Sequence, residues 1–171
     1  MTENTETYRN VPAGKALISV ICSGCKTPVL EVKFCNLVKP YYYQNSPDIP
    51  RYSITCLVDT DEHKEFLEGL QKIEKNEKVE SIVKFDTKKI KGEVVTTGKV
   101  LIKFQSRDMI PVYRKNENGE PIIVTLEDEL SKDEKVMVIY DILRYTKKNS
   151  AKNEYGLSFK PSCVYLCDRE D

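Results

Sequence analysis

Short segments in which apolar and polar residues alternate recur along this chain, and this pattern constrains the fold more than any other feature. In residues 98–104 the apolar side chains of Val100, Ile102 and Phe104 fall on every second position. One lysine precedes Val100, and another lies between Ile102 and Phe104. Successive side chains of a β-strand point to opposite faces of the sheet, so this spacing predicts a half-buried strand. Further strands are predicted at residues 15–22, 28–38, 52–58, 110–114, 121–126, 135–146 and 155–166.

One segment has helical periodicity instead, and it follows the predicted strand at residues 52–58. Asp59, with Glu62 three positions later, fits a capping box, so we expect the helix to begin at Asp59. The apolar positions that recur at helical spacing are Phe66, Leu67, Leu70 and Ile73.

Turn-forming residues separate the predicted strands. We expect turns at Ser23-Gly24 and at residues 116–119, and a loop over residues 39–50, which contain three prolines. Many short antiparallel strands with a single helix predict a mainly β fold. The best match is a Greek-key antiparallel barrel of the OB-fold type, with the one main helix between the early and the late strands.

The length of 171 residues suits one domain with a hydrophobic core. We expect a mobile tail at residues 1–13, the OB-fold domain at residues 14–167 and a short acidic tail at residues 168–171. The first ten residues are polar and include acids, unlike a secretory signal or a transit peptide. No apolar run is long enough to cross a bilayer, so the predicted location is the cytoplasm, which is that of the host if the gene is viral.

The net charge is zero, with 27 basic and 27 acidic residues, but the charges are segregated along the chain. Residues 84–107 contain seven bases and two acids, and residues 144–160 contain a single acid. Acids gather instead at residues 127–134 and at the C-terminus. Binding responds to the local field rather than to the net charge, so this distribution predicts one polyanion-binding face and an acidic back.

Tyrosines and basic residues lie close together at four places in the sequence. These places are residues 39–43 with Arg51-Tyr52, residues 99–107, residues 113–114 and the predicted hairpin at residues 141–161. Lysine and arginine bind phosphates along a groove, and unpaired bases stack on flat rings, at about 1–3 kcal/mol per base. Strand tyrosines also pack half-buried in many β proteins, but the three adjacent rings at residues 41–43 cannot all point into one core.

The six cysteines do not form a complete metal site. Cys22 and Cys25 have the spacing of a zinc knuckle, but a structural zinc needs four ligands and the second pair is missing. In a reducing compartment disulfides are not expected. We therefore expect buried or free thiols, with Cys22 and Cys25 as the only candidate zinc ligands.

Catalytic residues are also missing from the sequence. The single histidine, His63, lies in the first turn of the predicted helix, where we expect it to be solvated, and there is no phosphate-binding loop motif. The acids at residues 127–134 lack the spacing of a calcium loop. These observations predict a protein that is not an enzyme and has no cofactor.

A series of motifs follows this pattern of strands. PRYSITCLVD at residues 50–59 precedes the helix, and VLIKF at residues 100–104 follows it. The later motifs are PV at residues 111–112, GEPI at 119–122, VMVIYDILRY at 136–145, GLSFK at 156–160 and VYL at 164–166. In order and spacing this series resembles the bacteriophage-type OB-fold single-stranded DNA-binding proteins, over most of residues 14–166. The chain departs from that family at residues 131–134, where many members have a glycine, and in its shorter acidic end.

The resemblance implies a protein that coats and protects single-stranded DNA without sequence preference during phage DNA replication or recombination. It also implies replication or recombination enzymes as partners, and either a homodimer or a weakly associating monomer. The residues expected to bind phosphates are Lys39, Arg51, Lys99, Lys103, Arg107, Arg114, Arg144, Lys147, Lys148 and Lys160. The residues expected to stack on bases are Tyr41, Tyr42, Tyr43, Tyr113, Tyr140 and Tyr145.

Two alternatives remain open from the sequence. One is an OB-like protein-interaction module without a DNA role, and the other is a zinc-stabilised domain. The DNA-binding interpretation requires the cations and the rings to share one concave surface, with the hairpin at residues 141–161 as a wall of it.

Overall fold

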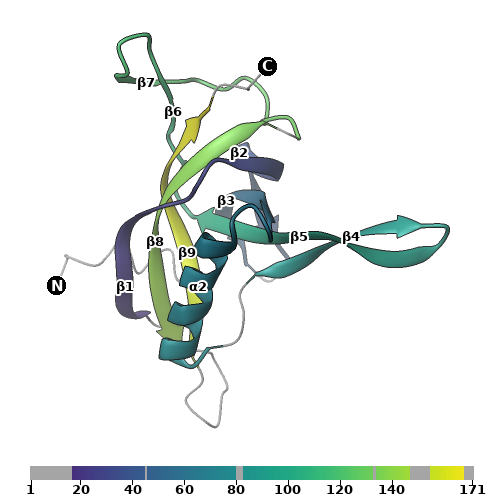
Figure 1. Ribbon diagram of the computed structural model, residues 1–171. Coiled ribbons are helices and arrows are strands. Elements are labelled where there is room, and N and C mark those ends of the chain that lie inside the picture. Colours follow the sequence, from purple (N-terminus) through teal and green to yellow (C-terminus); the bar gives the residue numbers. More distant parts are fainter. Residues whose placement is uncertain (1–16, 45, 80–82, 133, 147–154, 168–171) are drawn as a thin grey trace.

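The computed structural model describes residues 17–44, 46–79, 83–132, 134–146 and 155–167. This part of the chain contains one helix and nine strands (Figure 1). The helix is α2 (Lys64–Glu77). The strands are β1 (Leu17–Lys26), β2 (Leu30–Tyr43), β3 (Ser46–Asp59), β4 (Lys84–Ile90), β5 (Glu93–Ser106), β6 (Val112–Lys115), β7 (Pro121–Ile123), β8 (Lys135–Thr146) and β9 (Tyr155–Leu166).

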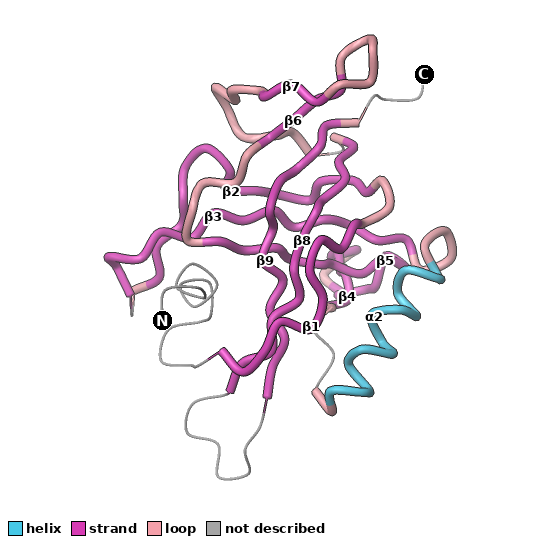
Figure 2. The backbone as a smooth tube through the Cα atoms, turned by 90° about the vertical axis from the view of Figure 1, so that its left-hand side faces the viewer, coloured by secondary structure: helices cyan, strands magenta, loops and turns pink. Residues whose placement is uncertain are grey.

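Five of the strands form a barrel. They are neighbours in the order β5, β3, β2, β8 and β9, and each is antiparallel to the next. β9 packs back against β5, where the ring centroids of Phe159 and Phe104 lie 5.7 Å apart, so the sheet curls round on itself (Figure 2). This confirms the predicted mainly β, OB-like class with one helix between the early and the late strands.

The remaining strands extend this barrel. β1 pairs with β8, and β4 continues the sheet beyond β5 as a hairpin that projects from the body in Figure 1. β6 pairs with β9 in parallel and with β7 in antiparallel orientation, so the sheet is mixed. The sequence pattern predicted only antiparallel strands. Two strands, β7 and β8, separate β6 from β9 in the sequence, and they run antiparallel to β6 and to β9 respectively. This connection leaves β6 and β9 parallel to each other.

The core lies inside the barrel and contains the alternating apolar residues of the strands. Val100, Ile102 and Phe104 are all buried, as their spacing predicts. The largest fully buried side chains are those of Leu30, Val32, Ile54, Val58, Ile102, Phe104, Val136, Val138, Ile142, Leu143 and Val164.

The helix begins later than the prediction at Asp59. The Oδ1 atom of Asp59 accepts hydrogen bonds from the backbone N–H groups of Asp61 (2.9 Å) and Glu62 (3.1 Å). The Asp59 carboxylate therefore caps a turn that precedes the helix rather than the helix itself. The same kind of side-chain hydrogen bond stabilises helix starts and isolated turns, so the sequence pattern fits both. The buried side chains of the helix are Leu67, Leu70 and Glu74.

Within residues 39–50, predicted as a loop, residues 39–43 form the end of β2 and residues 46–50 the start of β3. Tyr41 pairs with Arg51, so the two strands continue as a hairpin. A proline weakens a strand only where the ladder needs its missing N–H. Pro40 lies in an irregular stretch between the paired residues Asn36 and Tyr41, where the ladder does not need that group.

The β4–β5 hairpin was not predicted from the sequence. Ile90 pairs with Glu93 across the two-residue turn Lys91-Gly92, and both turn residues have positive φ, 52° and 82°. This is the geometry of a tight type I′ hairpin turn, for which Asn-Gly is the usual signal. Lysine seldom adopts positive φ, so the turn was not recognisable from the sequence.

Among the described residues, no helix combines the length and the apolar character that a membrane span needs.

Candidate nucleic-acid interface

Residues of β2, β3 and β5 that point away from the barrel core lie in register with one another, and we call the side of the sheet that they share the outer face. The register places Phe34 of β2 opposite Thr55 of β3, and Thr55 opposite Lys103 of β5. Residues directly opposite each other in a sheet point to the same side, so these three side chains form a row. The neighbouring row consists of Asn36, Ser53 and Gln105.

The helix covers the other side of β5. Val100 lines a hollow together with Leu67 of α2 and Phe85 of β4. Lys103 is three positions from Val100 and therefore points to the opposite side of the strand. The outer face is thus not the face that packs against the helix.

Phe34 is a large, exposed apolar residue of the outer face, and it is not among the site residues predicted from the sequence. Val32 pairs with Cys56 and Phe34 with Thr55, so two residues of β2 advance against one residue of β3. This bulge reverses the alternation and leaves the Phe34 side chain 52% exposed. Regular alternation from Val32 would have buried Phe34. The only sequence signal for the bulge is that Cys35 and Leu37 resume the apolar pattern one position out of phase.

Tyr41 and Tyr43 lie at the end of β2, beside two basic residues. The two rings pack edge to face, with centroids 5.2 Å apart. The guanidinium of Arg51 lies 5.7 Å from the centroid of the Tyr43 ring, and the Nζ atom of Lys103 lies 3.5 Å from the Tyr43 hydroxyl. The structure therefore joins two of the predicted stacking residues to two of the predicted phosphate-binding residues. We call the paired strand ends at residues 39–43 and 46–51 the aromatic arm.

Positive charge is concentrated beside the aromatic arm. Arg51 is only 6% exposed, and burial, followed by the charge of nearby Arg107, lowers the pKa of its guanidinium. Two guanidinium groups that repel each other are stabilised by an anion bound near both. The arrangement of Arg51, Arg107 and Lys103 therefore favours a phosphate at this end of the outer face.

Thr55 contributes a buried polar atom to the centre of the outer face. Its side chain is 3% exposed, and its Oγ1 atom has no hydrogen-bond partner within the described residues. Buried hydroxyl groups are normally hydrogen-bonded, and water or a ligand often supplies the missing partner. In the register row Thr55 lies between Phe34 and Lys103.

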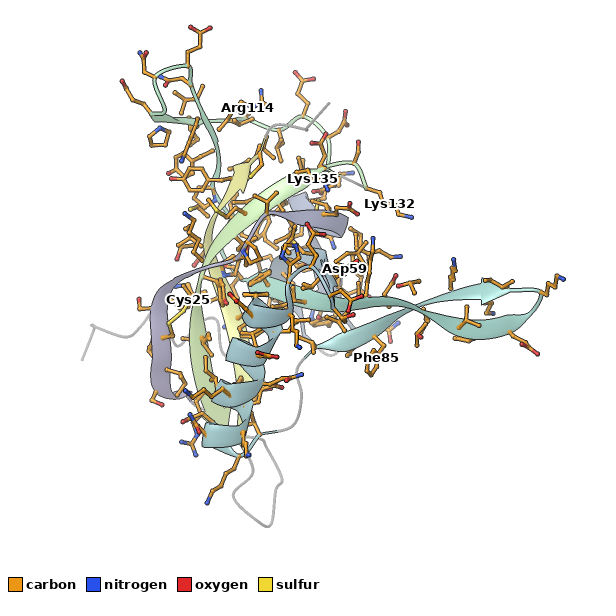
Figure 3. All side chains as sticks on the ribbon, in the orientation of Figure 1. Cys25, Asp59, Phe85, Arg114, Lys132 and Lys135 are labelled. Carbon is orange, nitrogen blue, oxygen red and sulfur yellow. A yellow bond between two sulfur atoms is a disulfide. The ribbon has the colours of Figure 1, made fainter. Side chains whose placement is uncertain are left out.

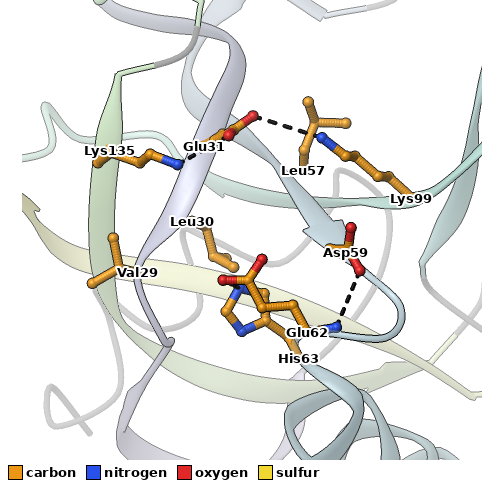
Figure 4. A pocket seen from close by; sticks show the side chains of 9 residues that line it. All are labelled: Val29, Leu30, Glu31, Leu57, Asp59, Glu62, His63, Lys99 and Lys135. Carbon is orange, nitrogen blue, oxygen red and sulfur yellow. Dashed lines mark hydrogen bonds and ion pairs between the residues drawn. The ribbon is translucent and has the colours of Figure 1, made fainter. Parts of the chain in front are cut away.

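Lys99 has a different environment from Lys103. Its Nζ atom lies 3.8 Å from a carboxylate oxygen of Glu31, which Lys135 also contacts at 2.9 Å (Figure 4). The hydrogen bond from Lys135 and the charges of both lysines lower the pKa of Glu31 against the effect of burial. Because Lys99 is already paired with an acid, we do not include it in the interface.

Tyr140, predicted to stack on bases, belongs to the core. Its side chain is 3% exposed, and its ring packs edge-on against Phe104 and Phe159 at 5.0 and 5.5 Å. Burial raises the pKa of its hydroxyl to about 12. A buried ring cannot stack on a base, so Tyr140 lies outside the interface.

The hairpin of β8 and β9 does not join the arm residues. Arg144 Nη1 contacts Glu77 Oε1 of α2 at 3.1 Å, so this guanidinium is held against the helix. Tyr145 packs over Gly156, and burial raises the pKa of the tyrosine hydroxyl. Lys160 is half-buried and lies opposite Asp141. Lys147 and Lys148, predicted as phosphate contacts, lie outside the described residues.

The last two predicted site residues lie on β6, beyond the barrel. Tyr113 stacks on Tyr165, with ring centroids 5.6 Å apart, and is half-buried. Arg114 is exposed on the β6–β7 extension, away from α2 (Figure 3).

The predicted residues that gather at the aromatic arm or beside it on the outer face are Lys39, Tyr41, Tyr42, Tyr43, Arg51, Lys103 and Arg107.

The cysteines do not form a zinc site in the structure. Cys22 and Cys25 are joined by a disulfide, so the prediction of buried or free thiols is wrong for this pair. Within the described ranges no group of three or more His, Cys, Asp or Glu side chains is placed to hold a metal ion.

Comparison with solved structures finds single-stranded DNA-binding proteins of bacteriophages. The protein from bacteriophage Enc34, in complex with single-stranded DNA, matches with a TM-score of 0.58 at 17% identity, over 94% of this chain and 98% of that chain. Its C-terminal truncation matches with a TM-score of 0.57 at 18% identity, over 90% and 98% of the two chains. The gp2.5 protein of bacteriophage T7 matches with a TM-score of 0.54 at 12% identity, over 85% and 86%.

The fold is that of the bacteriophage single-stranded DNA-binding proteins. The fold expected from the motif series is therefore confirmed over most of the chain. No protein-family model matches the sequence, and a search of curated proteins finds no match either. In this phage-type fold the outer face and the aromatic arm are the surface on which rings and cations meet.

Proposed function

We propose that this chain binds single-stranded DNA without sequence preference and without enzymatic activity. Phosphates bind to Lys103 and Arg107, with the buried Arg51 adding positive charge beside the Tyr43 ring, and bases stack on Phe34 and on the rings of the aromatic arm. The observation that carries the proposal is the cluster of rings and cations at the outer face and the aromatic arm, in which Phe34, Tyr41 and Lys103 are exposed and Arg51 lies beside the Tyr43 ring.

The mixture of rings and cations favours a single strand over a duplex. Each unpaired base gains about 1–3 kcal/mol by stacking on a ring, and this gain does not depend on which base it is. Bases in a duplex are already stacked on each other and have no free face for Phe34. The likeness to the Enc34 protein, whose structure includes single-stranded DNA, supports the same ligand class.

The proposed role is to coat and protect single strands during phage DNA replication or recombination. That role places the protein in the cytoplasm of a host cell, with replication or recombination enzymes as partners. A homodimer agrees with the exposed edge strand β4, because an unpaired edge can add a strand from a second copy.

The direct test is a titration with oligo-dT in which binding is monitored by tyrosine fluorescence. We expect saturable quenching, because bases that stack on Tyr41 and Tyr43 remove emission from those rings. Oligonucleotides of mixed sequence should quench similarly, and a duplex of the same length should bind more weakly.

The control is a Tyr41→Phe/Tyr43→Phe variant. It keeps the rings for stacking but removes the two emitters, so binding should persist while the quenching amplitude falls. Absence of any complex with oligo-dT at low salt, in a gel shift of the wild-type protein, would rule out the proposed function.

A further inference from the structure

An acidic side chain holds the base of the aromatic arm. β2 pairs with β3 at Asn36–Ser53 and again at Tyr41–Arg51. Four residues of β2 lie between these pairs, against a single residue of β3. The extra residues lose their ladder partners on β3, and backbone N–H groups without a partner are costly when buried.

Glu129, from the loop before β8, binds the N–H groups of the extra residues. Leu37 N–H donates to Oε1 at 2.5 Å, and Lys39 N–H donates to Oε2 at 2.9 Å. Val38 N–H lies between them and donates to both oxygens, at 2.9 and 3.0 Å. The remaining residue between the two pairs is Pro40, which has no N–H group.

The carboxylate thus satisfies every backbone donor of the irregular stretch. Three consecutive N–H groups turn toward one anion, which a regular strand cannot do because its successive N–H groups point in opposite directions. Tyr41 follows immediately after this stretch, so the contact with Glu129 determines the direction in which the aromatic arm leaves the barrel.

We propose that Glu129 is a positioning residue for single-stranded DNA binding, which holds the aromatic arm in its binding orientation without touching the DNA. The inference rests on the proposed function of the outer face. It predicts an effect of unusual sign. Removing a negative charge from a DNA-binding protein ordinarily strengthens binding, whereas removing the charge of Glu129 should weaken it.

The test compares Glu129→Gln with Glu127→Gln, an exposed acid of the same loop. Both variants lose one negative charge, but the amide that replaces the Glu129 carboxylate has only one oxygen with which to accept hydrogen bonds. We expect the affinity for oligo-dT to fall about tenfold in Glu129→Gln, equivalent to about 1.4 kcal/mol. In Glu127→Gln it should stay unchanged or rise. Equal affinities in the two variants would overturn the proposal.

A double-mutant cycle separates positioning from general destabilisation. In a Tyr41→Ala/Tyr42→Ala/Tyr43→Ala background the arm has no rings left to orient. Adding Glu129→Gln should therefore cause no further loss of affinity. A further tenfold loss in that background would show that Glu129 acts through overall stability, and the proposal would be wrong.

Amide hydrogen exchange tests the contact without DNA. In Glu129→Gln the amides of Leu37, Val38 and Lys39 should lose protection, while those of the β3–β5 ladder keep it. Glu129→Asp, which retains the charge on a shorter side chain, should give an intermediate result. If the wild-type protein binds no DNA, the proposed function fails even though this exchange pattern holds. If it binds DNA and Glu129→Gln binds equally well, only the positioning role fails.

Discussion

At the scale of single residues, the environment of each ring decides what it can do. Phe34 and Tyr140 are both aromatic residues of strands, yet the first is 52% exposed and the second 3% exposed. The bulge after Val32 turns Phe34 outward, whereas regular alternation in β8 places Tyr140 among the core rings. Only Phe34 is therefore available to stack on a base.

Replacing Phe34 by alanine should weaken binding to oligo-dT by about 5- to 150-fold, the equivalent of about 1–3 kcal/mol for one lost stacking contact. Phe85→Ala is the matched control, because Phe85 is also an exposed strand residue but lies opposite Val100, on the side of the sheet next to α2. Phe34→Tyr keeps a ring and should bind normally. Fluorescence anisotropy of a labelled oligonucleotide measures all three, and equal losses in the two alanine variants would contradict the assignment.

At the scale of elements, the β8–β9 hairpin depends on a glycine. Gly156 is buried opposite Tyr145, and a Cβ atom at this position would lie 2.5 Å from the tyrosine Cζ atom. The ring covers the glycine and fills the space that a side chain would otherwise occupy, as aromatic residues do beside glycines in other sheets. The two residues therefore form one packing unit at the end of the hairpin.

Gly156→Ala should lower the free energy of unfolding by about 1–3 kcal/mol, because the Tyr145 ring must leave its position. Tyr145→Ala removes the ring that the new methyl group would meet. The double variant should therefore lose less free energy of unfolding than the two single variants lose in sum. Urea denaturation of the four proteins measures this coupling, and strictly additive changes would mean that the ring moves aside without cost.

At the scale of the whole molecule, the location of the charges matters more than their sum. The net charge is zero, yet Arg51, Lys103 and Arg107 gather at one end of the outer face. Other lysines, such as Lys72 and Lys75, are exposed on α2. A bound strand on the outer face releases counterions only where cations meet its phosphates.

The salt dependence of binding should therefore distinguish the two groups. Lys103→Gln/Arg107→Gln should reduce the slope of log K against log salt by about 0.7 for each lost phosphate contact. Lys72→Gln/Lys75→Gln changes the net charge by the same amount and should leave the slope unchanged. Oligo-dT titrations between low and moderate salt provide both slopes, and a similar reduction in both variants would place the DNA elsewhere.

The sequence by itself determined the fold class and most of the strands. Alternation at residues 98–104 predicted which side chains are buried, since a side chain's face follows directly from its position in a regular strand. The same rule failed at Phe34 and at residues 37–40, where β2 has more residues than β3. A bulge depends on the partner strand, and the sequence does not show which strand that is.

Tertiary structure alone decided how the candidate site is assembled. Glu129 lies 90 residues from Lys39 in the sequence, and Lys103 lies 60 from Tyr43. No local pattern connects such residues, because their contacts arise from closure of the barrel. The sequence therefore named several of the cations and rings. The closed barrel decided that Tyr140 belongs to the core, that Arg144 belongs to the helix contact, and that Tyr43, Arg51 and Lys103 belong together.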